Sequence, residues 1–191
     1  MDQTNTADDH VPRFSEGIEK LSLRRGTMYL VLEEKPSLAY QVFNHFVRQN
    51  GYDGSDGEER KGDPRPCRAL VMTRQYPPDL KRSKYIEPAD IYWLTTNISK
   101  ESNVLSPSSI TRLNYIMSEF LQGAGSGMAV IDCIEYVITQ NSFETLLRML
   151  QSWNDKIVGS RNNLLLSLDP FTLTIQQLHL IKRETLELVL P

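Results

Sequence analysis

The segment Thr27-Met-Tyr-Leu-Val-Leu32 and the turn Glu33-Glu-Lys-Pro36 after it are the strongest indication of the fold of this protein. Six uncharged residues predict a buried strand, and Pro36 fits the first turn of a following helix that we expect to reach Gln49. In α/β proteins that hydrolyse nucleotides, this turn carries the glycine-rich sequence GxxxxGK[ST]. Here it has no glycine and two carboxylates, which repel a phosphate anion, and Pro36 supplies no N–H. The segment therefore predicts an α/β fold without the usual phosphate loop.

Apolar strand-like segments alternate with helical patterns along the rest of the chain. Helices are predicted from Ser106-Pro107, after Asn141, and at Thr174-x-x-Gln177, which has the form of a capping box. Strands that are apolar throughout, alternating with helices, indicate a mostly parallel sheet of five or six strands in a three-layer α/β/α sandwich. The predicted strands are Met28–Leu32, Ala69–Thr73, Ile91–Thr96, Met128–Ile134 and Leu164–Leu168, with Leu186–Leu190 as an edge strand of the six-stranded alternative.

We expect a single α/β domain at residues 27–191, a length that suits one hydrophobic core. Residues 1–26 are polar and lack periodicity, which predicts a disordered tail. Residues 51–68 are rich in glycine, proline and charge and predict a flexible surface loop.

Composition excludes several classes of function. The net charge of −3 gives no reason to expect a nucleic-acid partner. Cys67 and Cys133 are far apart in the sequence and form no CxxC pair, so we expect neither a metal nor a cofactor. No run of about 18 apolar residues predicts a membrane span, and no signal sequence is apparent, so we expect a cytoplasmic protein.

Polar residues follow the end of each predicted strand, and the carboxyl ends of parallel strands meet at the edge where α/β proteins bind ligands. One interpretation is a pocket for a nucleotide or another small ligand. The other, which we favour, is that strand ends become polar anyway and cap the next helix. The candidate ligand-binding residues are Glu34, Lys35, Thr73, Arg74, Thr95, Asp132, Glu135 and Asp169.

Asp132 ends the string Met128-Ala-Val-Ile-Asp132, the pattern of an apolar strand and an aspartate that positions magnesium in phosphate-loop enzymes. Without the lysine and hydroxyl of that loop, it has no metal–phosphate partner. Asp132 and Glu135 could pair as general acid and base or bind a divalent cation, but capping or a salt bridge is the favoured interpretation. Arg74 is expected to pair with Glu33, Glu34 or Asp132. We assign no catalytic residue.

Several strings in this sequence resemble the archaeal family known as domain of unknown function 835, over about Thr27 to Glu184. They are Tyr29-Leu-Val-Leu-Glu-Glu-Lys-Pro36, Thr73-Arg74, Trp93-Leu94-Thr95, Leu105-Ser-Pro107, Ile131-Asp132-x-Ile134-Glu135-Tyr136, Ile138-Thr-Gln-Asn141, Phe143, Leu150-Gln151-Ser152, Asn154-Asp155-Lys156 and Asp169-Pro170.

The resemblance implies a degenerate relative of RecA/KaiC-type ATPases that has lost the phosphate loop, with strand order 5-1-4-3-2. It also implies a regulatory role in archaeal signalling. Cys133 stands where the family leads us to expect glycine, which would narrow a pocket beside Asp132.

Two functional hypotheses follow. The first is a non-enzymatic signalling or scaffold module that binds protein partners, with homo-oligomers among the options. The second is a nucleotide- or small-ligand-responsive domain, weakly hydrolytic at most, with its pocket at the carboxyl edge of the sheet.

Overall fold

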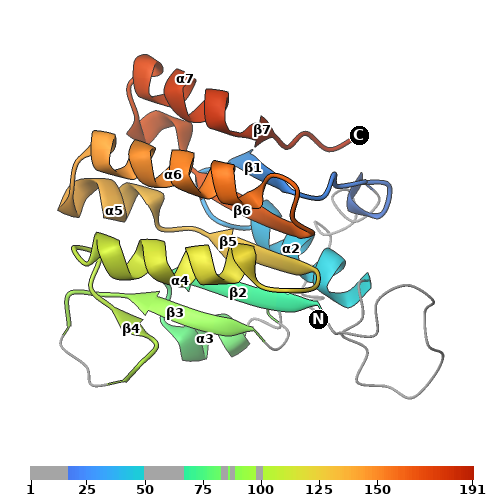
Figure 1. The fold of residues 1–191 in the computed structure, drawn as a ribbon, viewed down its shortest axis with the longest axis horizontal. Helices are drawn as coiled ribbons and strands as arrows, with labels where there is room; N and C mark the ends of the chain where they lie inside the picture. The colour runs from blue at the N-terminus through green and yellow to red at the C-terminus, as the bar shows by residue number, and fades with distance from the viewer. Residues whose placement is uncertain (1–16, 50–66, 83–85, 87–88, 98–100) are drawn as a thin grey trace, which may run out of the picture.

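A computed structural model describes residues 17–49, 67–82, 86, 89–97 and 101–191. It contains one sheet of seven strands, all parallel, in the order β4-β3-β2-β5-β6-β1-β7 (Figure 1). The strands are β1 (Thr27–Leu32), β2 (Arg68–Thr73), β3 (Asp90–Leu94), β4 (Val104–Leu105), β5 (Gly127–Ile131), β6 (Asn162–Leu168) and β7 (Leu186–Glu187). The helices are α2 (Leu38–Gln49), α3 (Pro77–Arg82), α4 (Ile110–Gln122), α5 (Ile134–Gln140), α6 (Phe143–Ile157), the 3-10 turn η1 (Pro170–Thr172) and α7 (Ile175–Glu184).

Helices cover both faces of the sheet, so the predicted α/β/α sandwich is confirmed (Figure 1). Side chains alternate between the two faces along each strand. In β1, Met28 and Leu30 pack in the core beneath α4, α5, α6 and α7, whereas Tyr29 and Val31 pack beneath α2 and α3. Because both faces are covered, the central strands are apolar at nearly every position.

The strand order predicted for the five assigned strands is wrong. It placed β6 at an edge and β3 between β5 and β2, whereas β6 lies between β5 and β1, and β2 lies between β5 and β3. Burial explains both differences. All seven residues of β6 are buried, as in a central strand, while β3 includes the exposed Asp90 and belongs nearer the edge. The count of five or six strands is also exceeded, because β4 was not predicted and pairs beside β3.

Several predicted boundaries differ from the structure. The edge strand expected at Leu186–Leu190 ends at Glu187, the strand expected at Ile91–Thr96 ends at Leu94, and the helix expected from Pro36 begins at Leu38. The strand expected at Met128–Ile134 ends at Ile131, and Ile134 already begins α5. The helix expected from Ser106-Pro107 begins at Ile110. The capping box of α7 is confirmed, because the Thr174 hydroxyl accepts from Gln177 N–H and the Gln177 side chain accepts from Thr174 N–H.

The predicted tail and loop fall largely outside the described residues, which omit 1–16 and 50–66. Residues 17–26 are described, and they carry Ile18, which is buried against the α2 side of the sheet with Leu21 and Leu23 beside it. Among the helices that the structure describes, none combines the length and apolar character needed to cross a membrane.

Candidate functional site at the carboxyl end of the sheet

The carboxyl ends of β1, β2, β5 and β6 bring polar residues from distant parts of the chain to one end of the sheet. Thr73 is the last residue of β2, and Asp132 follows β5 directly. These two strands are neighbours, and Asp132 N–H continues their ladder by donating to Met72 O at 3.1 Å. The Thr73 hydroxyl consequently reaches the Asp132 carboxylate, at 2.8 Å from Oδ2.

Asp132 is the centre of a hydrogen-bond network. Besides Thr73, its Oδ2 accepts from Tyr40 Oη at 2.7 Å and from Gln75 Nε2 at 3.2 Å, and its Oδ1 accepts from Arg74 N–H at 3.3 Å. Tyr40 comes from α2 and is buried. The carboxylate therefore joins the first turn of α2 to the end of β2.

Burial raises the pKa of Asp132, although all four hydrogen bonds favour the charged form and act in the opposite direction. The pKa of Tyr40 is also raised, first by burial and then by the Asp132 charge, so the phenol stays protonated and donates. Cys133 lies behind the carboxylate, fully buried, with its thiol 3.6 Å from Met72 O. Burial and the charges of Asp132 and Glu135 raise the pKa of this thiol, so it is an apolar packing group.

Glu33 occupies the N-terminus of α2. Its Oε2 accepts from Ser37 N–H at 2.9 Å and Leu38 N–H at 2.7 Å. Its Oε1 accepts from Ala39 N–H at 3.2 Å and from Ser167 Oγ on β6 at 2.7 Å. The N–H groups at the start of a helix after a strand are those that bind phosphate in nucleotide-binding proteins. Here a carboxylate of the chain itself receives them.

Glu135 and Asp169 also hold backbone groups. Glu135 Oε1 accepts from Asp169 N–H at 2.8 Å, and Asp169 Oδ1 accepts from Phe171 N–H at 2.9 Å, which caps η1. The pKa of Glu135 is raised mainly by burial, and the charges of Asp132 and Asp169 act in the same direction. These contacts link the first turn of α5 to the end of β6.

Arg74 does not form the expected ion pair in the contacts that the structure describes. Its guanidinium lies 3.7 Å from the centre of the Tyr136 ring, and its carbonyl accepts from Trp93 Nε1 at 3.2 Å. Its backbone N–H nevertheless lies at Asp132. The structure therefore brings Thr73, Arg74 and Asp132 together.

The remaining candidate residues have separate surroundings. Glu34 and Lys35 are exposed on the turn before α2. Thr95 is buried beyond the end of β3, where its hydroxyl accepts from Asn97 N–H at 3.1 Å. No contact of these three with Asp132 appears in the part of the chain that the structure describes.

Sequence reasoning missed three contributors to this end of the sheet, namely Tyr40, Gln75 and Ser167, and it named Glu33 only as a possible ion-pair partner of Arg74. A signal existed for Glu33, because a carboxylate four to six residues before free helical N–H groups is a capping arrangement. No role was predicted for Tyr40, and no sequence pattern relates it to Asp132.

Most acceptor positions of the Asp132 and Glu33 carboxylates are occupied by donors of the chain itself. Asp132 Oδ2 accepts three hydrogen bonds and the two oxygens of Glu33 accept four, while Asp132 Oδ1 accepts one, from Arg74 N–H. Among the described residues, no group of three or more His, Cys, Asp or Glu side chains is placed to hold a metal ion. Two cavities, of about 80 and 510 Å³, lie at the opposite, amino end and include Gly127 and Gly123 respectively in their walls.

Fold and site define a parallel α/β sandwich in which carboxylates at the carboxyl edge accept hydrogen bonds from the chain's own groups. The chain belongs to the family described as "Protein of unknown function (DUF835)", whose model matches residues 63–185. The match runs from just before β2 to the start of β7, so β1 and α2 lie outside it, although the resemblance was expected to begin at Thr27. No curated protein matches the chain.

Proposed function

We propose that this protein is a non-enzymatic regulatory or scaffold module of archaeal signalling, which acts through protein–protein contacts on a RecA-like fold without a phosphate loop. The signalling role and the archaeal setting come from the family resemblance. The RecA-like fold and the mode of action are argued from the topology and the surface.

Strand order supports the RecA-like fold. If β3 and β4 are treated as additions at one edge, the other strands, numbered along the chain, are β1, β2, β5, β6 and β7. Renumbered 1 to 5 in chain order, these five strands lie in the spatial order 5-1-4-3-2, which is β7-β1-β6-β5-β2. This set differs from the five strands predicted from the sequence, because it includes β7 and leaves out β3. In that scheme Asp132 follows the third strand and Glu33 follows the first, where a phosphate loop would begin.

The contacts of Glu33 support a non-enzymatic role. A bound phosphate needs the first N–H groups of α2, and these donate to Glu33 at 2.7 to 3.2 Å. A phosphate would have to displace this carboxylate and then lie beside its negative charge.

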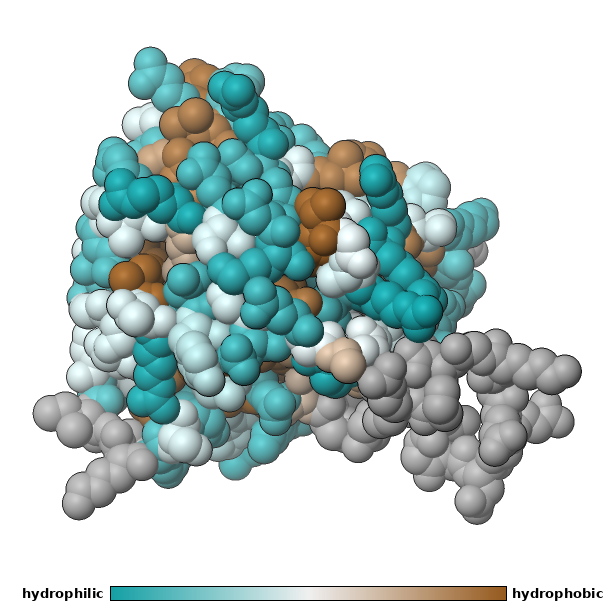
Figure 2. Space-filling model, in the orientation of Figure 1, coloured by the Kyte–Doolittle hydropathy of each residue, from teal (hydrophilic) through white to brown (hydrophobic). Residues whose placement is uncertain are grey.

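The observation that carries the proposal is the exposed apolar surface of the C-terminal segment. Phe171 and Ile175, at η1 and the start of α7, are 85% and 78% exposed. Figure 2 shows apolar surface at the top of the molecule, where Figure 1 places α7. Large apolar side chains exposed within one short stretch of chain are typical of a contact surface for another protein.

Affinity capture with surface variants tests the proposal. The full chain is used as bait in an extract of its source cells, and each captured protein is purified and tested for direct binding. We expect one partner that binds wild type and Tyr115→Ser but not Phe171→Ser/Ile175→Ser. Tyr115 is a matched control because it is 63% exposed on α4, away from the C-terminal segment. Equal binding of every captured protein to all three baits would contradict the proposal.

A second candidate function is response to a nucleotide or small ligand, favoured by the convergence of Thr73, Arg74 and Asp132. It predicts a magnesium-dependent rise in melting temperature with a nucleotide, and loss of that rise in Asp132→Ala. A ligand at 100 times its dissociation constant adds about 2.7 kcal/mol to the free energy of unfolding, which is several degrees. No shift with nucleotides, cyclic dinucleotides or divalent metals would exclude this candidate.

A further inference from the structure

The outer edge of β7 presents backbone hydrogen-bonding groups and exposed apolar side chains, which are the features of a strand that pairs with another strand. We infer that β7 binds the β7 of a second copy of this chain in antiparallel orientation, so that two seven-stranded sheets join into one around a two-fold axis. The inference rests on the proposed function, because it names the partner for one contact surface of the module.

The register of β7 determines which of its backbone groups face outward. β7 is parallel to β1, with Leu186 opposite Tyr29 and Glu187 opposite Leu30. Leu188 N–H donates to Leu30 O at 2.8 Å. Since alternate residues of a parallel strand bond the same neighbour, Leu186 and Leu188 face β1, and Glu187 directs its N–H and C=O groups away from the sheet. Val189 follows the two residues of β7, and it does the same once a partner strand extends the ladder past Leu188. Such groups form a template for a further strand.

Two copies of β7 that pair antiparallel, with the two-fold axis passing beside Leu188, can form hydrogen bonds with these outward-facing N–H and C=O groups. In that register Glu187 lies opposite the partner's Val189, and each such pair exchanges two backbone hydrogen bonds. An axis at Glu187 would instead place two carboxylates directly opposite each other, which is unfavourable. Repulsion between the two Glu187 carboxylates therefore disfavours the register centred on Glu187 relative to the one centred on Leu188.

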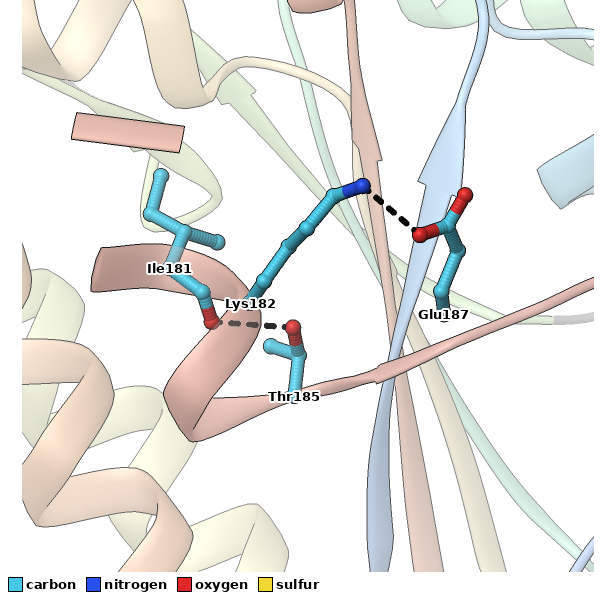
Figure 3. A network of polar contacts seen from close by, with 4 residues as sticks. All are labelled: Ile181, Lys182, Thr185 and Glu187. Carbon is cyan, nitrogen blue, oxygen red and sulfur yellow. Dashed lines mark hydrogen bonds and ion pairs between the residues drawn. The ribbon is translucent and has the colours of Figure 1, made fainter. Parts of the chain in front are cut away.

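The Glu187 side chain is already partly neutralised. Lys182 Nζ on α7 lies 2.8 Å from Glu187 Oε2, and the Thr185 hydroxyl donates to Ile181 O at 2.9 Å (Figure 3). These contacts attach the start of β7 to the end of α7 and hold the Glu187 carboxylate on the α7 side of the sheet. The strand is thus positioned before a partner arrives.

Apolar side chains beside the outward groups are left exposed in the single chain. Val189 is 73% exposed and Leu186 is 53% exposed. In the register centred on Leu188, Leu186 meets the partner's Leu190, and Val189 meets the stem of the partner's Glu187. Pairing therefore removes apolar surface from water on both faces of the strand.

The opposite edge of the sheet is less suited to a partner strand. β4 and β7 both have two residues, but just before β4 the Ser102 carbonyl accepts from Arg112 Nη2 at 2.8 Å. A long side chain thus covers a carbonyl group at that edge, as native proteins do to prevent strand pairing.

Sedimentation velocity on the full chain tests the inference. Over concentrations from about 1 to 500 μM, a dimer that involves one short strand should appear reversibly. Val189→Pro removes one outward N–H per copy and leaves the bond from Leu188 to Leu30 intact, so we expect its dissociation constant to rise at least tenfold. Val189→Thr keeps the N–H and the branched side chain and should dimerise as wild type does. Unchanged circular dichroism in both variants confirms the fold.

Disulfide trapping tests the register. Residues 187 and 189 of a bonded antiparallel pair have Cα atoms about 5.5 Å apart, which suits a disulfide. Glu187→Cys/Val189→Cys should form a covalent dimer with oxidised glutathione, whereas wild type, whose Cys67 and Cys133 are buried, should not. A wild type that stays monomeric, a dimer unaffected by Val189→Pro, or no covalent dimer from the double variant would overturn the inference. Capture that depends on Phe171 and Ile175 would still be tested separately, so the two proposals can fail independently.

Discussion

At the residue scale, the Glu33 carboxylate accepts the N–H groups at the start of α2, which in nucleotide-binding proteins donate to a bound phosphate. This carboxylate accepts three such N–H groups and the Ser167 hydroxyl, so Glu33 connects β1, α2 and β6. A negative charge at a helix N-terminus is also favoured by the helix dipole. The sequence reveals two glutamates in this turn, and the structure shows that they have different roles, since Glu34 is exposed.

Glu33→Ala should therefore lower the free energy of unfolding by about 1 to 3 kcal/mol, because four donors lose a charged acceptor. Urea denaturation measures the change. Glu34→Ala is the matched control and should remain within about 0.5 kcal/mol of wild type. Added phosphate or acetate should restore part of the loss in Glu33→Ala by occupying the freed N–H groups. Equal effects of the two substitutions would contradict this account of Glu33.

Asp132 should make stability depend on pH in a characteristic direction. Its pKa is raised by burial in the folded state, so the folded protein binds a proton more tightly than the unfolded chain does. The stability from this group is present below the unfolded pKa of about 3.9 and is lost as pH rises towards the folded pKa.

Asp132→Asn removes this dependence. We expect the free energy of unfolding of wild type, minus that of the variant, to fall as pH rises from about 4. Urea denaturation at a series of pH values measures the difference. Glu135 is present in both proteins, and the part of its raised pKa that comes from burial, the largest cause, is common to both. A difference that rises with pH would show that the hydrogen bonds to Asp132 outweigh its burial.

At the scale of elements, α4 and α6 give a comparison of two serines at the same cap position. Both helices lie on the same face of the sheet, and each has serine at its N-cap. Ser142 accepts from Thr145 N–H at 3.1 Å, whereas the Ser109 side chain makes no capping bond. Sequence alone treats the two positions alike, and backbone conformation distinguishes them: Ser142 is extended, with φ −126° and ψ 159°, and Ser109 is not.

Ser142→Ala should cost about 1 kcal/mol of unfolding free energy, because one N–H of α6 loses its acceptor. Ser109→Ala should cost little, which makes it the control. Thermal unfolding of both variants under the same conditions measures the pair. A loss for Ser109→Ala as large as that for Ser142→Ala would mean that both serines cap in solution.

At the scale of the whole molecule, Arg68 joins segments that are far apart in the sequence. Its Nη2 donates to Phe120 O at 2.9 Å, Gly123 O at 3.0 Å and Asn162 Oδ1 at 3.0 Å. Its guanidinium also lies 4.7 Å from the centre of the Phe120 ring. One side chain at the amino end of the sheet thus connects β2, the end of α4 and β6.

Arg68→Met keeps the length of the side chain but leaves these acceptors without their donor, so we expect a loss of about 3 kcal/mol. Arg112→Met is the control, because the Arg112 side chain donates an exposed bond to Ser102 O, and we expect its loss to change stability by about 0.5 kcal/mol or less. Chemical denaturation measures both. A smaller loss for Arg68→Met than for Arg112→Met would contradict the role assigned to Arg68.

Local sequence patterns predicted much of the fold. Uninterrupted apolar strands predicted the sandwich, and the Thr174 capping box predicted the start of α7 correctly. Where local signals conflicted, prediction failed. Ile134–Gln140 contains several β-branched residues after a strand and was partly assigned to that strand, although it forms α5. Packing of Ile134 and Val137 in the core determines the helix there.

The candidate site was predictable in location but not in composition. The strand-end rule placed Thr73, Arg74 and Asp132 correctly at one end, because neighbouring parallel strands bring their ends together. It could not identify Tyr40, whose hydroxyl reaches Asp132 only through the packing of α2 on the sheet. It also could not assign Arg74 to the Tyr136 ring, since several acids and rings lie within reach of a long side chain.

The class of fold and the absence of a glycine-rich phosphate loop follow from the amino-acid sequence alone, because hydrophobic periodicity and the residues of one turn are local properties. The strand order, the network around Asp132 and the position of the Glu33 carboxylate at α2 follow only from the packing of the folded chain. These depend on contacts between residues as far apart in the chain as Glu33 and Ser167, and the free energy of such contacts becomes available only when the whole sheet has formed.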